Sequence, residues 1–490
     1  MAKLSRYTLF YDNCPQPGEY LGFNTRTQAV IGIDREMKDF IDRITTAKST
    51  HIINNNNVGI TSKEQEYLNE LKESGIIVDD DVDEKRVLEH WFNQIKYQSK
   101  SLHATILTTY KCNFACVYCF EERVKQPKSL DETTTNQIIE WLKHQVEEKR
   151  LNSLRLMFYG GEPLMNPKAM IQIAVALSKW AKETGIKFTF GITTNGSLVR
   201  PALIDELSKI GLKSIRITLD GDKAHHDKRR PFLDGRGSFD TIINNISAVI
   251  NRVNPVIGDD NELYTASVPN GLKVEISGNF DRDNMESIYY LLDYLDEHGL
   301  SKKIRNVIFA PVIARLGESK NPPTPPLLRG DKGGIEGNFI MPIPVEMVGC
   351  HSLSGELGEA AVKLRREVIQ RGYKVDKSAV VTACPMGQDH SMVVIDPYGD
   401  IYKCAGFVGR PEFSVGNVRA DRFNYRHTEF MTMNLWKQCP DCIYVPMCGG
   451  GCRLMAQLKH SDCTKISCDI EYYQKLLPEL VKMDYEGGLL

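Results

Sequence analysis

Residues 112–121 read CNFACVYCFE and bring three cysteines, Cys112, Cys116 and Cys119, onto one short loop. The loop follows closely on a strand-like apolar run, Ala104-Thr105-Ile106-Leu107. Three thiolates at this spacing can wrap a single 4Fe–4S cluster, and a cube held by three cysteines leaves its fourth iron open to another ligand. A zinc ion would require a fourth protein ligand, which the neighbouring sequence does not supply well. The spacing therefore predicts a reactive cluster, with three unrelated thiols as the alternative.

Strand-like and helical segments alternate around that loop, from residue 101 to about 310. Apolar runs predict strands at 104–107, 154–158, 187–192 and 214–219, and amphipathic stretches predict helices near 131–148, 167–184, 201–210 and 238–252. This alternation implies a parallel sheet, either open or closed into a barrel. In such folds the ligand-binding residues gather at the C-terminal ends of the strands.

A second motif, Tyr159-Gly160-Gly161-Glu162-Pro163, follows the second predicted strand. Together with Cx₃CxxC it resembles the radical SAM superfamily, in which a 4Fe–4S cluster binds S-adenosyl-L-methionine (SAM) on a partial (β/α)₆ barrel. The resemblance implies that this loop binds the methionine amino group of SAM. Its glycines would let the backbone approach the ligand, and Glu162 would order the loop. We therefore predict an α/β fold whose centre is a partial (β/α)₆ radical SAM barrel.

The same resemblance implies further SAM contacts at later strand ends. Thr194-Asn195-Gly196 and Thr218-Leu219-Asp220-Gly221 occupy the places where the family contacts ribose and the methionine carboxylate. His226 and Arg230 match an HDxxR segment, and a guanidinium suits a carboxylate partner. Satisfied turns, helix caps and core packing are the alternatives for these residues. The SAM-binding residues implied by the resemblance are Tyr118 and Phe120 beside adenine, with Gly160, Gly161, Glu162, Thr194, Asn195, Thr218, Asp220 and Arg230.

Eight of the chain's 13 cysteines lie in residues 384–468. Seven of them, together with a Gly416-Asn417-Val418 turn, resemble the SPASM domain in their order and spacing. A zinc ribbon is the alternative for part of this pattern. SPASM domains carry two auxiliary 4Fe–4S clusters, so the resemblance assigns Cys439, Cys442, Cys448 and Cys468 to an outer cluster and Cys384, Cys404 and Cys452 to an inner one.

The C-terminal cysteines depart from the SPASM pattern in two ways. Cys463 competes with Cys468 as a ligand of the outer cluster, although the aromatic helix that follows favours Cys468. The inner cluster has no evident fourth cysteine, so one of its irons is open to an outside ligand unless Cys350 closes the site. A buried, structural role is the other interpretation of Cys350, and the one we expect for Cys14.

The composition is that of an ordinary globular protein, with 42% hydrophobic and 25% charged residues. A formal net charge of −2 argues against a general nucleic-acid binder. The sequence contains neither an apolar run of about 18 residues, as a membrane span needs, nor the apolar core of a signal peptide. We therefore expect a cytoplasmic protein, without nucleic-acid or membrane partners, whose cysteines serve as ligands rather than disulfides.

We predict five segments along the chain. Residues 1–100 form a small α+β module with a hairpin around 21–33 and helices near 34–46 and 62–74, set apart from every cluster cysteine. Peptide maturases begin with a comparable module that captures a leader peptide, here by strand addition; a mere structural extension is the alternative. The other segments are the barrel (101–317), a Pro/Gly-rich inserted loop (318–345), a bridging helix (346–380) and the SPASM domain (381–490).

Three functions compete within this resemblance. Radical SAM/SPASM maturases modify a short ribosomally made precursor peptide, often by a thioether crosslink. Anaerobic sulfatase-maturating enzymes generate formylglycine and place an acidic residue directly after the cysteine that matches Cys404, where this chain has Ala405. A non-catalytic electron-transfer protein would leave the GGEP-type loop without a purpose. The sequence therefore favours a peptide maturase, a radical SAM oxidoreductase that generates a 5′-deoxyadenosyl radical and takes its electron from a donor such as flavodoxin or ferredoxin.

Overall fold

A ten-stranded sheet in the order β14-β13-β12-β9-β8-β7-β6-β15-β16-β17 forms the centre of the protein. The computed structural model describes residues 2–46, 60–119, 127–251, 256–257, 263–264, 271–314, 340–342, 355–375, 384–389 and 392–488. Within them, consecutive strands of the barrel region pair in parallel: β6 (Ser101–Thr109), β7 (Ser153–Gly160), β8 (Lys187–Thr194), β9 (Leu212–Thr218), β12 (Lys273–Phe280) and β13 (Asn306–Ala314). The predicted α/β fold with a largely parallel sheet is confirmed.

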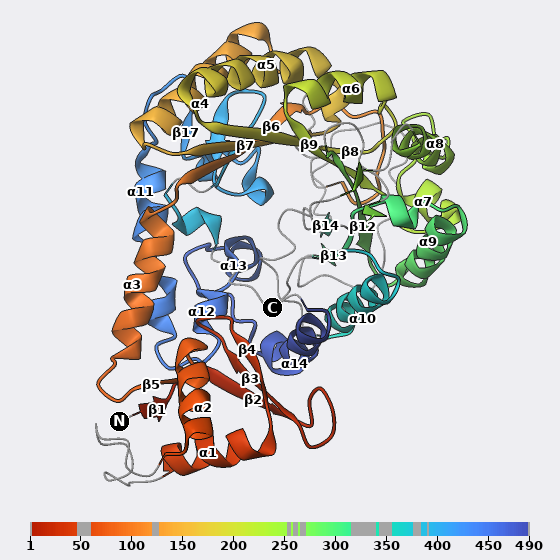
Figure 1. Ribbon diagram of the computed structural model, residues 1–490. Helices are drawn as coiled ribbons and strands as arrows, with labels where there is room; N and C mark the ends of the chain where they lie inside the picture. Colours follow the sequence, from red (N-terminus) through yellow and green to blue (C-terminus); the bar gives the residue numbers. More distant parts are fainter. Residues whose placement is uncertain are drawn as a thin grey trace.

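Helices lie along the outer side of this curved sheet (Figure 1). Their bounds are α4 (Glu132–Glu148), α5 (Pro167–Thr184), α6 (Pro201–Ile210), α7 (Lys223–Arg229), α8 (Phe239–Ile250) and α9 (Met285–Glu297). The Asp131 carboxylate caps α4 by accepting the Thr134 N–H at 2.8 Å. Helix α5 begins with a proline and ends before Gly185, whose φ of 76° suits the left-handed position after a helix. These local signals explain why the four helices predicted in this region agree with the structure to within two residues.

The cysteine-rich C-terminal region continues the same sheet. Strand β15 (Met392–Ile395) pairs in parallel with β6, and β16 (Asp400–Tyr402) and β17 (Gly416–Asn417) extend the edge in antiparallel fashion. The buried Asp396 carboxylate accepts hydrogen bonds from the hydroxyl of Tyr110 (2.9 Å) and the N–H groups of Tyr398 and Asp400 (both 2.9 Å). The short strands of this region therefore join the core of the barrel.

The N-terminal module contains a three-stranded antiparallel sheet, β2-β3-β4, formed by Thr8–Asp12, Tyr20–Asn24 and Val30–Ile33. The predicted hairpin corresponds to β3 and β4, and the predicted helices to α1 (Arg35–Thr46) and α2 (Ser62–Glu73). A second pair of strands, β1 (Ala2–Leu4) and β5 (Ile77–Asp79), and helix α3 (Glu84–Tyr97) complete it. The sequence interpretation did not include these last three elements.

This module packs directly against the C-terminal cysteine region (Figure 1). The Phe92 ring of α3 stacks on Trp436 with centroids 4.6 Å apart, and Cys439 and Cys442 pack against the same apolar cluster. Leu21 and Phe23 of β3 share a second core with the short helix α12 (Val445–Cys448) and the last helix, α14 (Ile470–Glu486). The expected separation of the module from the cluster cysteines is therefore wrong.

The remaining described elements are β10 (Val256–Ile257), β11 (Leu263–Tyr264), β14 (Ile340–Pro342), α10 (Glu356–Gln370), α11 (Tyr425–Thr432) and α13 (Arg453–His460). Helix α10 matches the predicted bridging helix. Phe120, Cys350 and most of the predicted insert at 318–345 lie outside the described residues; the described part of that insert is strand β14, which pairs with β13 instead of forming a loop. Within the described part of the chain, no helix combines the length and apolarity that a membrane span requires.

Candidate active site

Cys112, Cys116 and Cys119 lie together on the loop after β6. Each side chain is half-buried, and burial raises the pKa of the Cys112 thiol to about 12, with smaller contributions from Cys116 and Cys119. Two N–H groups face the Cys112 sulfur: the backbone N–H of Phe114 at 3.4 Å and the side-chain amide of Asn195 at 3.9 Å. Hydrogen bonds of this kind to sulfur are typical of iron–sulfur sites, and bound iron would deprotonate the thiols. The loop therefore fits a cluster held by three cysteines.

The glycine-rich loop after β7 packs against the segment that leads into Cys112. The N–H groups of Gly161 and Glu162 donate to the carbonyl oxygens of Thr109 (2.9 Å) and Lys111 (2.8 Å). A Cβ at Gly160 would meet the Thr109 oxygen at 2.4 Å, and a Cβ at Gly161 would meet the Lys111 oxygen at 2.3 Å. The sequence interpretation assigned these glycines to close approach of a ligand. In the structure they allow two protein loops to approach each other.

Glu162 follows β7 and connects the C-terminal end of that strand to the C-terminal end of β8. Its fully buried carboxylate accepts hydrogen bonds from the Thr194 hydroxyl (2.8 Å), the Asn195 N–H (2.7 Å) and the Leu164 N–H (2.9 Å). Burial raises the pKa of this carboxyl group, and the three hydrogen bonds oppose that rise. The Asn195 amide in turn donates to Asn113 at 2.8 Å. Glu162 and Asn195 thus fix the cysteine loop and the glycine-rich loop relative to each other.

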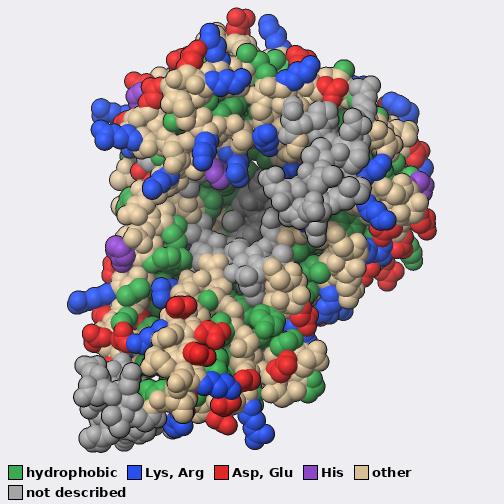
Figure 2. Space-filling model, in the orientation of Figure 1, with side chains coloured by type: hydrophobic (Ala, Val, Ile, Leu, Met, Phe, Trp, Pro, Cys, Tyr) green, Lys and Arg blue, Asp and Glu red, His purple; other side chains and the backbone are tan. Residues whose placement is uncertain are grey.

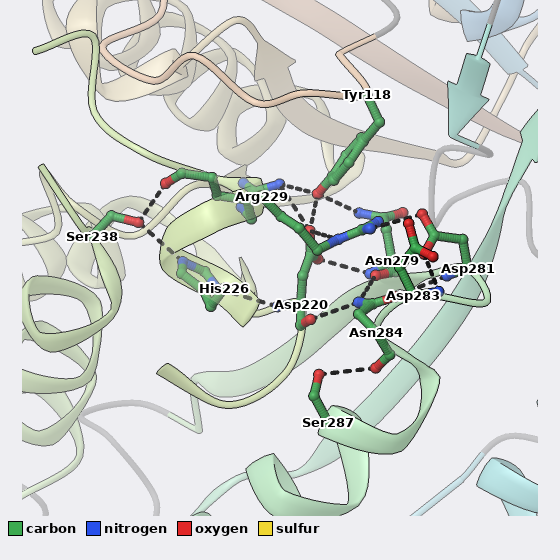
Figure 3. A network of polar contacts seen from close by, with 11 residues as sticks. Tyr118, Asp220, His226, Arg229, Ser238, Asn279, Asp281, Asp283, Asn284 and Ser287 are labelled. Atoms are coloured by element: carbon green, nitrogen blue, oxygen red, sulfur yellow. Dashed lines mark hydrogen bonds and ion pairs between the residues drawn. The ribbon is translucent and has the colours of Figure 1, made fainter. Parts of the chain in front are cut away.

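A buried polar network lies below the cysteine loop, around Tyr118 and Asp220 (Figure 3). The Tyr118 hydroxyl donates to Asp220 and accepts from Arg230 at 2.6 Å and from the Asn279 amide at 3.2 Å. The guanidinium groups of Arg229 and Arg230 lie 5.1 and 6.0 Å from the Tyr118 ring centroid. Burial disfavours the charge of Arg230, but Cys116, Tyr118 and Asp220 together raise its pKa. The guanidinium groups of Arg229 and Arg230 therefore both lie beside Tyr118, which belongs to the cysteine loop.

His226 supports this network as a neutral imidazole. Burial, followed by Arg230 and Arg229, holds its pKa well below the ordinary value. Its Nδ1 accepts the Asp220 N–H at 3.2 Å, while Ser238 uses its own hydroxyl proton to bond the Arg230 carbonyl at 2.7 Å. Nε2 must therefore carry the proton that is shared with Ser238 at 3.0 Å. His226 fixes the backbone at Asp220 and Arg230 without carrying charge.

Nine of the ten predicted SAM-binding residues are described, and the tenth, Phe120, is not. Tyr118 lies on the cysteine loop, Arg230 directly follows α7, and the other seven lie at the C-terminal ends of β7, β8 and β9. Thr218 lies at the end of β9, where its hydroxyl is 3.3 Å from that of Ser277. Sequence reasoning missed Asn113, Asn279 and Arg229. Asn279 lies near the C-terminal end of β12, so recognising that strand would have revealed it. Arg229 retains two buried N–H-bearing atoms, Nε and Nη2, without a hydrogen-bond partner among the described residues, which fits an anionic ligand nearby.

The four cysteines predicted for an outer cluster lie near one another. Burial raises the pKa of Cys439, and the neighbouring thiols of Cys442 and Cys468 raise it further. Burial also raises the pKa of Cys448 to about 12, with smaller contributions from Cys439 and Cys442. Cys463, the rival ligand, is buried, and its carbonyl accepts a hydrogen bond from Arg453 at 2.9 Å. This geometry favours Cys468 over Cys463.

Three buried donors without hydrogen-bond partners in the described residues belong to the surroundings of these four cysteines. They are the Tyr7 hydroxyl, the Trp436 indole N–H and the Ser467 hydroxyl. Tyr7 and Trp436 share an apolar cluster with Cys439 and Cys442, and Ser467 precedes Cys468. Leaving a buried donor unsatisfied costs roughly 1–3 kcal/mol, and the sulfur atoms of a cluster would accept hydrogen bonds from these three groups. The donors therefore fit an iron–sulfur cluster.

Cys384, Cys404 and Cys452 belong to the core that continues from the barrel. A cavity of about 50 Å³ adjoins Cys384 and is also lined by Lys96, Trp436 and Arg453. Within the described residues, no three His, Cys, Asp or Glu side chains are arranged to hold a metal ion.

Comparison with known proteins agrees with this geometry. The sequence profile of the Radical SAM superfamily matches residues 106–258. The chain is 25% identical over 277 residues to the radical SAM cyclopropyl synthase TigE of Paramaledivibacter caminithermalis, covering 50% of this chain and 57% of TigE. It is 25% identical over 354 residues to the mycofactocin maturase MftC of Mycolicibacterium smegmatis, covering 70% of this chain and 76% of MftC. The match covers about half of the length of the first two curated relatives, 46% of one and 57% of the other.

The fold is also similar to a solved structure, anSMEcpe with bound AdoMet, at a TM-score of 0.56 and 16% identity over 79% of this chain and 99% of that one. Residues 106–258 therefore match the Radical SAM superfamily both in sequence and in the fold that surrounds them. Within that superfamily it resembles the radical SAM peptide maturases.

Proposed function

We propose that the protein is a radical SAM oxidoreductase that matures a ribosomally made precursor peptide by a thioether or similar crosslink. The similarity to MftC carries this proposal, because it extends over 354 residues, well beyond the radical SAM domain itself. When bound, the cluster and SAM supply a 5′-deoxyadenosyl radical that removes a hydrogen atom from substrate. The protein's own residues hold and orient these groups.

In this proposal Cys112, Cys116 and Cys119 hold the cluster, and the strand-end residues bind SAM. Glu162 and Asn195 fix the two loops that meet at the cluster. Arg229, whose Nε and Nη2 have no hydrogen-bond partner among the described residues although Nε lies 4.0 Å from the Asp220 carboxylate, joins Arg230 as a cation that can face the methionine carboxylate. The buried network below Tyr118 keeps both guanidinium groups in place and excludes water from beneath the loop.

We propose the five segments predicted from sequence as domains, with a SPASM-type region at 381–490. Cys439, Cys442, Cys448 and Cys468 would hold an outer auxiliary 4Fe–4S cluster, which the three buried donors support. Cys384, Cys404 and Cys452 would hold an inner auxiliary cluster. Auxiliary clusters at these sites would accept the electron that a crosslinking reaction releases.

The N-terminal module is proposed to bind the leader part of the precursor along β4. The Asn24 N–H donates to the Ala29 carbonyl oxygen at 3.1 Å, so residues 24 and 29 form a hydrogen-bonded pair. In an antiparallel pair of strands, bonded and non-bonded positions alternate, so the N–H and C=O groups of Val30 and Gly32 point away from β3, toward the open edge of β4. An extended peptide could pair with that edge. The face shown in Figure 2 is hollowed at its centre, beside the barrel, and the proposed peptide would enter the barrel from there.

Formylglycine formation is the second candidate, supported by the fold similarity to anSMEcpe. Ala405, which follows Cys404, argues against it, because the acidic residue expected there as a proton acceptor is absent. The η6 turn at Ala405–Phe407 is largely buried. A sulfatase-derived peptide should therefore remain unmodified under conditions in which the precursor is crosslinked.

The test requires the precursor peptide, which we expect a short reading frame beside the gene to encode. Deleting the N-terminal module is unsuitable because it would expose the C-terminal core, so we choose the substitution Val30→Pro. Proline removes the outward N–H and is tolerated on an edge strand, whereas the control Val30→Thr keeps that N–H. Val30→Pro should abolish the mass change of the peptide but retain SAM cleavage. Wild-type modification by Val30→Pro would refute leader binding at β4, and no modification of the peptide by the wild-type enzyme would refute the maturase function.

A further inference from the structure

His103 and Arg155 lie side by side on the concave face of the partial barrel. Side chains alternate along a strand, and every second residue of β6 and β7 belongs to the core on the side of the outer helices: Leu102, Ala104, Ile106, Leu154, Leu156 and Phe158. The residues between them, His103 and Arg155 included, therefore face the opposite, concave side. The two residues are direct partners in the parallel register of β6 and β7. Adjacent strands are about 4.8 Å apart, so the two side chains leave the sheet next to each other.

The Arg155 guanidinium is available to a ligand. The side chains of His103 and Arg155 are both accessible to solvent. Burial nevertheless lowers the pKa of His103, and the positive charge of Arg155 lowers it further, as expected for groups within a recess. In the part of the chain that the structure describes, Arg155 has no hydrogen-bond or ion-pair partner. An accessible guanidinium of this kind suits an anion, which it can bind through two parallel hydrogen bonds.

The rest of the concave face leaves this charge without compensation. Arg216 of β9 is neutralised by Glu275 of β12, whose carboxylate lies 2.9 Å away. Glu275 is the only acid on the concave side of the six parallel strands, all of which the structure describes. The direct partner of Arg155 on β8 is the uncharged Thr189. The face as a whole is therefore positive, and it complements a negatively charged ligand.

The position of Arg155 along β7 fixes its distance from the cluster end of the barrel. Arg155 precedes Gly160, the last residue of that strand, by five positions. At about 3.3 Å per residue, these positions span about 16 Å. An extended peptide covers about 3.3–3.6 Å per residue, so about five of its residues would bridge that span.

We propose that Arg155, with His103 beside it, binds a carboxylate of the precursor peptide and thereby selects which residue of the peptide reaches the cluster end of the barrel. This inference rests on the peptide-maturase function proposed above. The carboxylate belongs to an Asp or Glu side chain or to the C-terminus of the peptide, about five residues from the modified position. The guanidinium supplies two charge-assisted hydrogen bonds, and the N–H of a neutral His103 imidazole supplies a third. Arg155 is thus a specificity-determining residue.

The experiment removes the carboxylates of the peptide one at a time. The precursor peptide is compared with versions in which each Asp or Glu is changed singly to Asn or Gln, and with a version that ends in a carboxamide. The KM and kcat of modification are measured by mass spectrometry with wild-type enzyme, Arg155→Gln and Arg155→Lys, and SAM cleavage without peptide is recorded for each. The matched control is Lys209→Gln, an exposed cation on α6, outside the sheet.

With wild-type enzyme, we expect one of the neutralised peptides to raise KM about tenfold, and its identity distinguishes a side-chain carboxylate from the C-terminal one. Arg155→Gln should abolish this difference between the two peptides, because the partner of the carboxylate is gone. Arg155→Lys should keep part of the difference, about threefold, and Lys209→Gln should keep all of it.

Two outcomes would overturn the carboxylate contact. In the first, every neutralised peptide has the KM of the original peptide with wild-type enzyme. In the second, the tenfold difference persists in Arg155→Gln, so that another residue binds the carboxylate. No modification of the original peptide by wild-type enzyme that cleaves SAM would instead refute the underlying maturase function.

Discussion

The two cysteine regions of the molecule are built in different ways. The loop at 112–119 gathers three cysteines within eight residues, and two neighbouring strand ends fix it through Glu162 and Asn195. The C-terminal cysteines are spread from 384 to 468 and depend on packing by Phe92 and Tyr7 of the distant N-terminal module. A local site can be identified from spacing alone. A dispersed site depends on the whole fold, so it should respond to substitutions far away in the sequence.

The largest effect is expected from a substitution that disrupts only the site formed by Cys112, Cys116 and Cys119. Gly161→Ala places a Cβ 2.3 Å from the Lys111 oxygen, so the segment leading into Cys112 must move. We expect loss of about four irons per chain and of SAM cleavage, with the C-terminal iron retained. Iron analysis of anaerobically reconstituted protein measures this. Gly387→Ala, where a Cβ has no neighbour within 4 Å, is the control and should keep both properties. Full iron content in Gly161→Ala would contradict the role of this close contact.

A smaller, selective effect is expected at the dispersed site. Phe92→Ala removes a buried ring that stacks on Trp436, at a cost of about 3–5 kcal/mol in the free energy of unfolding. Because Cys439 and Cys442 pack in the same cluster, the C-terminal iron should be lost before the iron at Cys112. Denaturant unfolding with iron analysis tests this order. Val87→Ala, on the exposed side of the same helix, should leave both quantities unchanged. Simultaneous loss from both sites would show that the two regions are not independent.

The smallest effect concerns the surface charges at the same interface. Asp441 lies between Cys439 and Cys442 and pairs with Arg6 at 2.9 Å and Lys85 at 2.8 Å, but 76% of its side chain is exposed. These ion pairs hold the pKa of Asp441 below its ordinary value, and exposed pairs of this kind contribute little to stability. Asp441→Asn should therefore resemble wild type in iron content and melting temperature. A marked loss of iron would mean that charge, rather than the packing around Phe92, holds the module in place.

The same contrast explains how far the sequence could predict the structure. Helices α4 to α6, α8 and the cysteine loop depend on local periodicity, capping and spacing, so their positions were predictable. The hydrogen bond from Tyr110 to Asp396 joins residues 286 positions apart, and the pairing of β15 with β6 beside it has no local signal. The packing of the N-terminal module on the C-terminal cysteines was missed for the same reason. The glycine pair illustrates a third case, in which the structure adds a close contact between two protein loops that the sequence motif does not reveal.

The central claim is that Cys112, Cys116 and Cys119 hold the cluster that cleaves SAM, while the C-terminal cysteines hold two more. The most direct test measures iron content and SAM cleavage in the anaerobic Cys112→Ala/Cys116→Ala/Cys119→Ala variant and in wild type. Wild type should carry about twelve irons, and the variant should lose about a third of them together with all SAM cleavage. SAM cleavage by the triple variant would contradict the account.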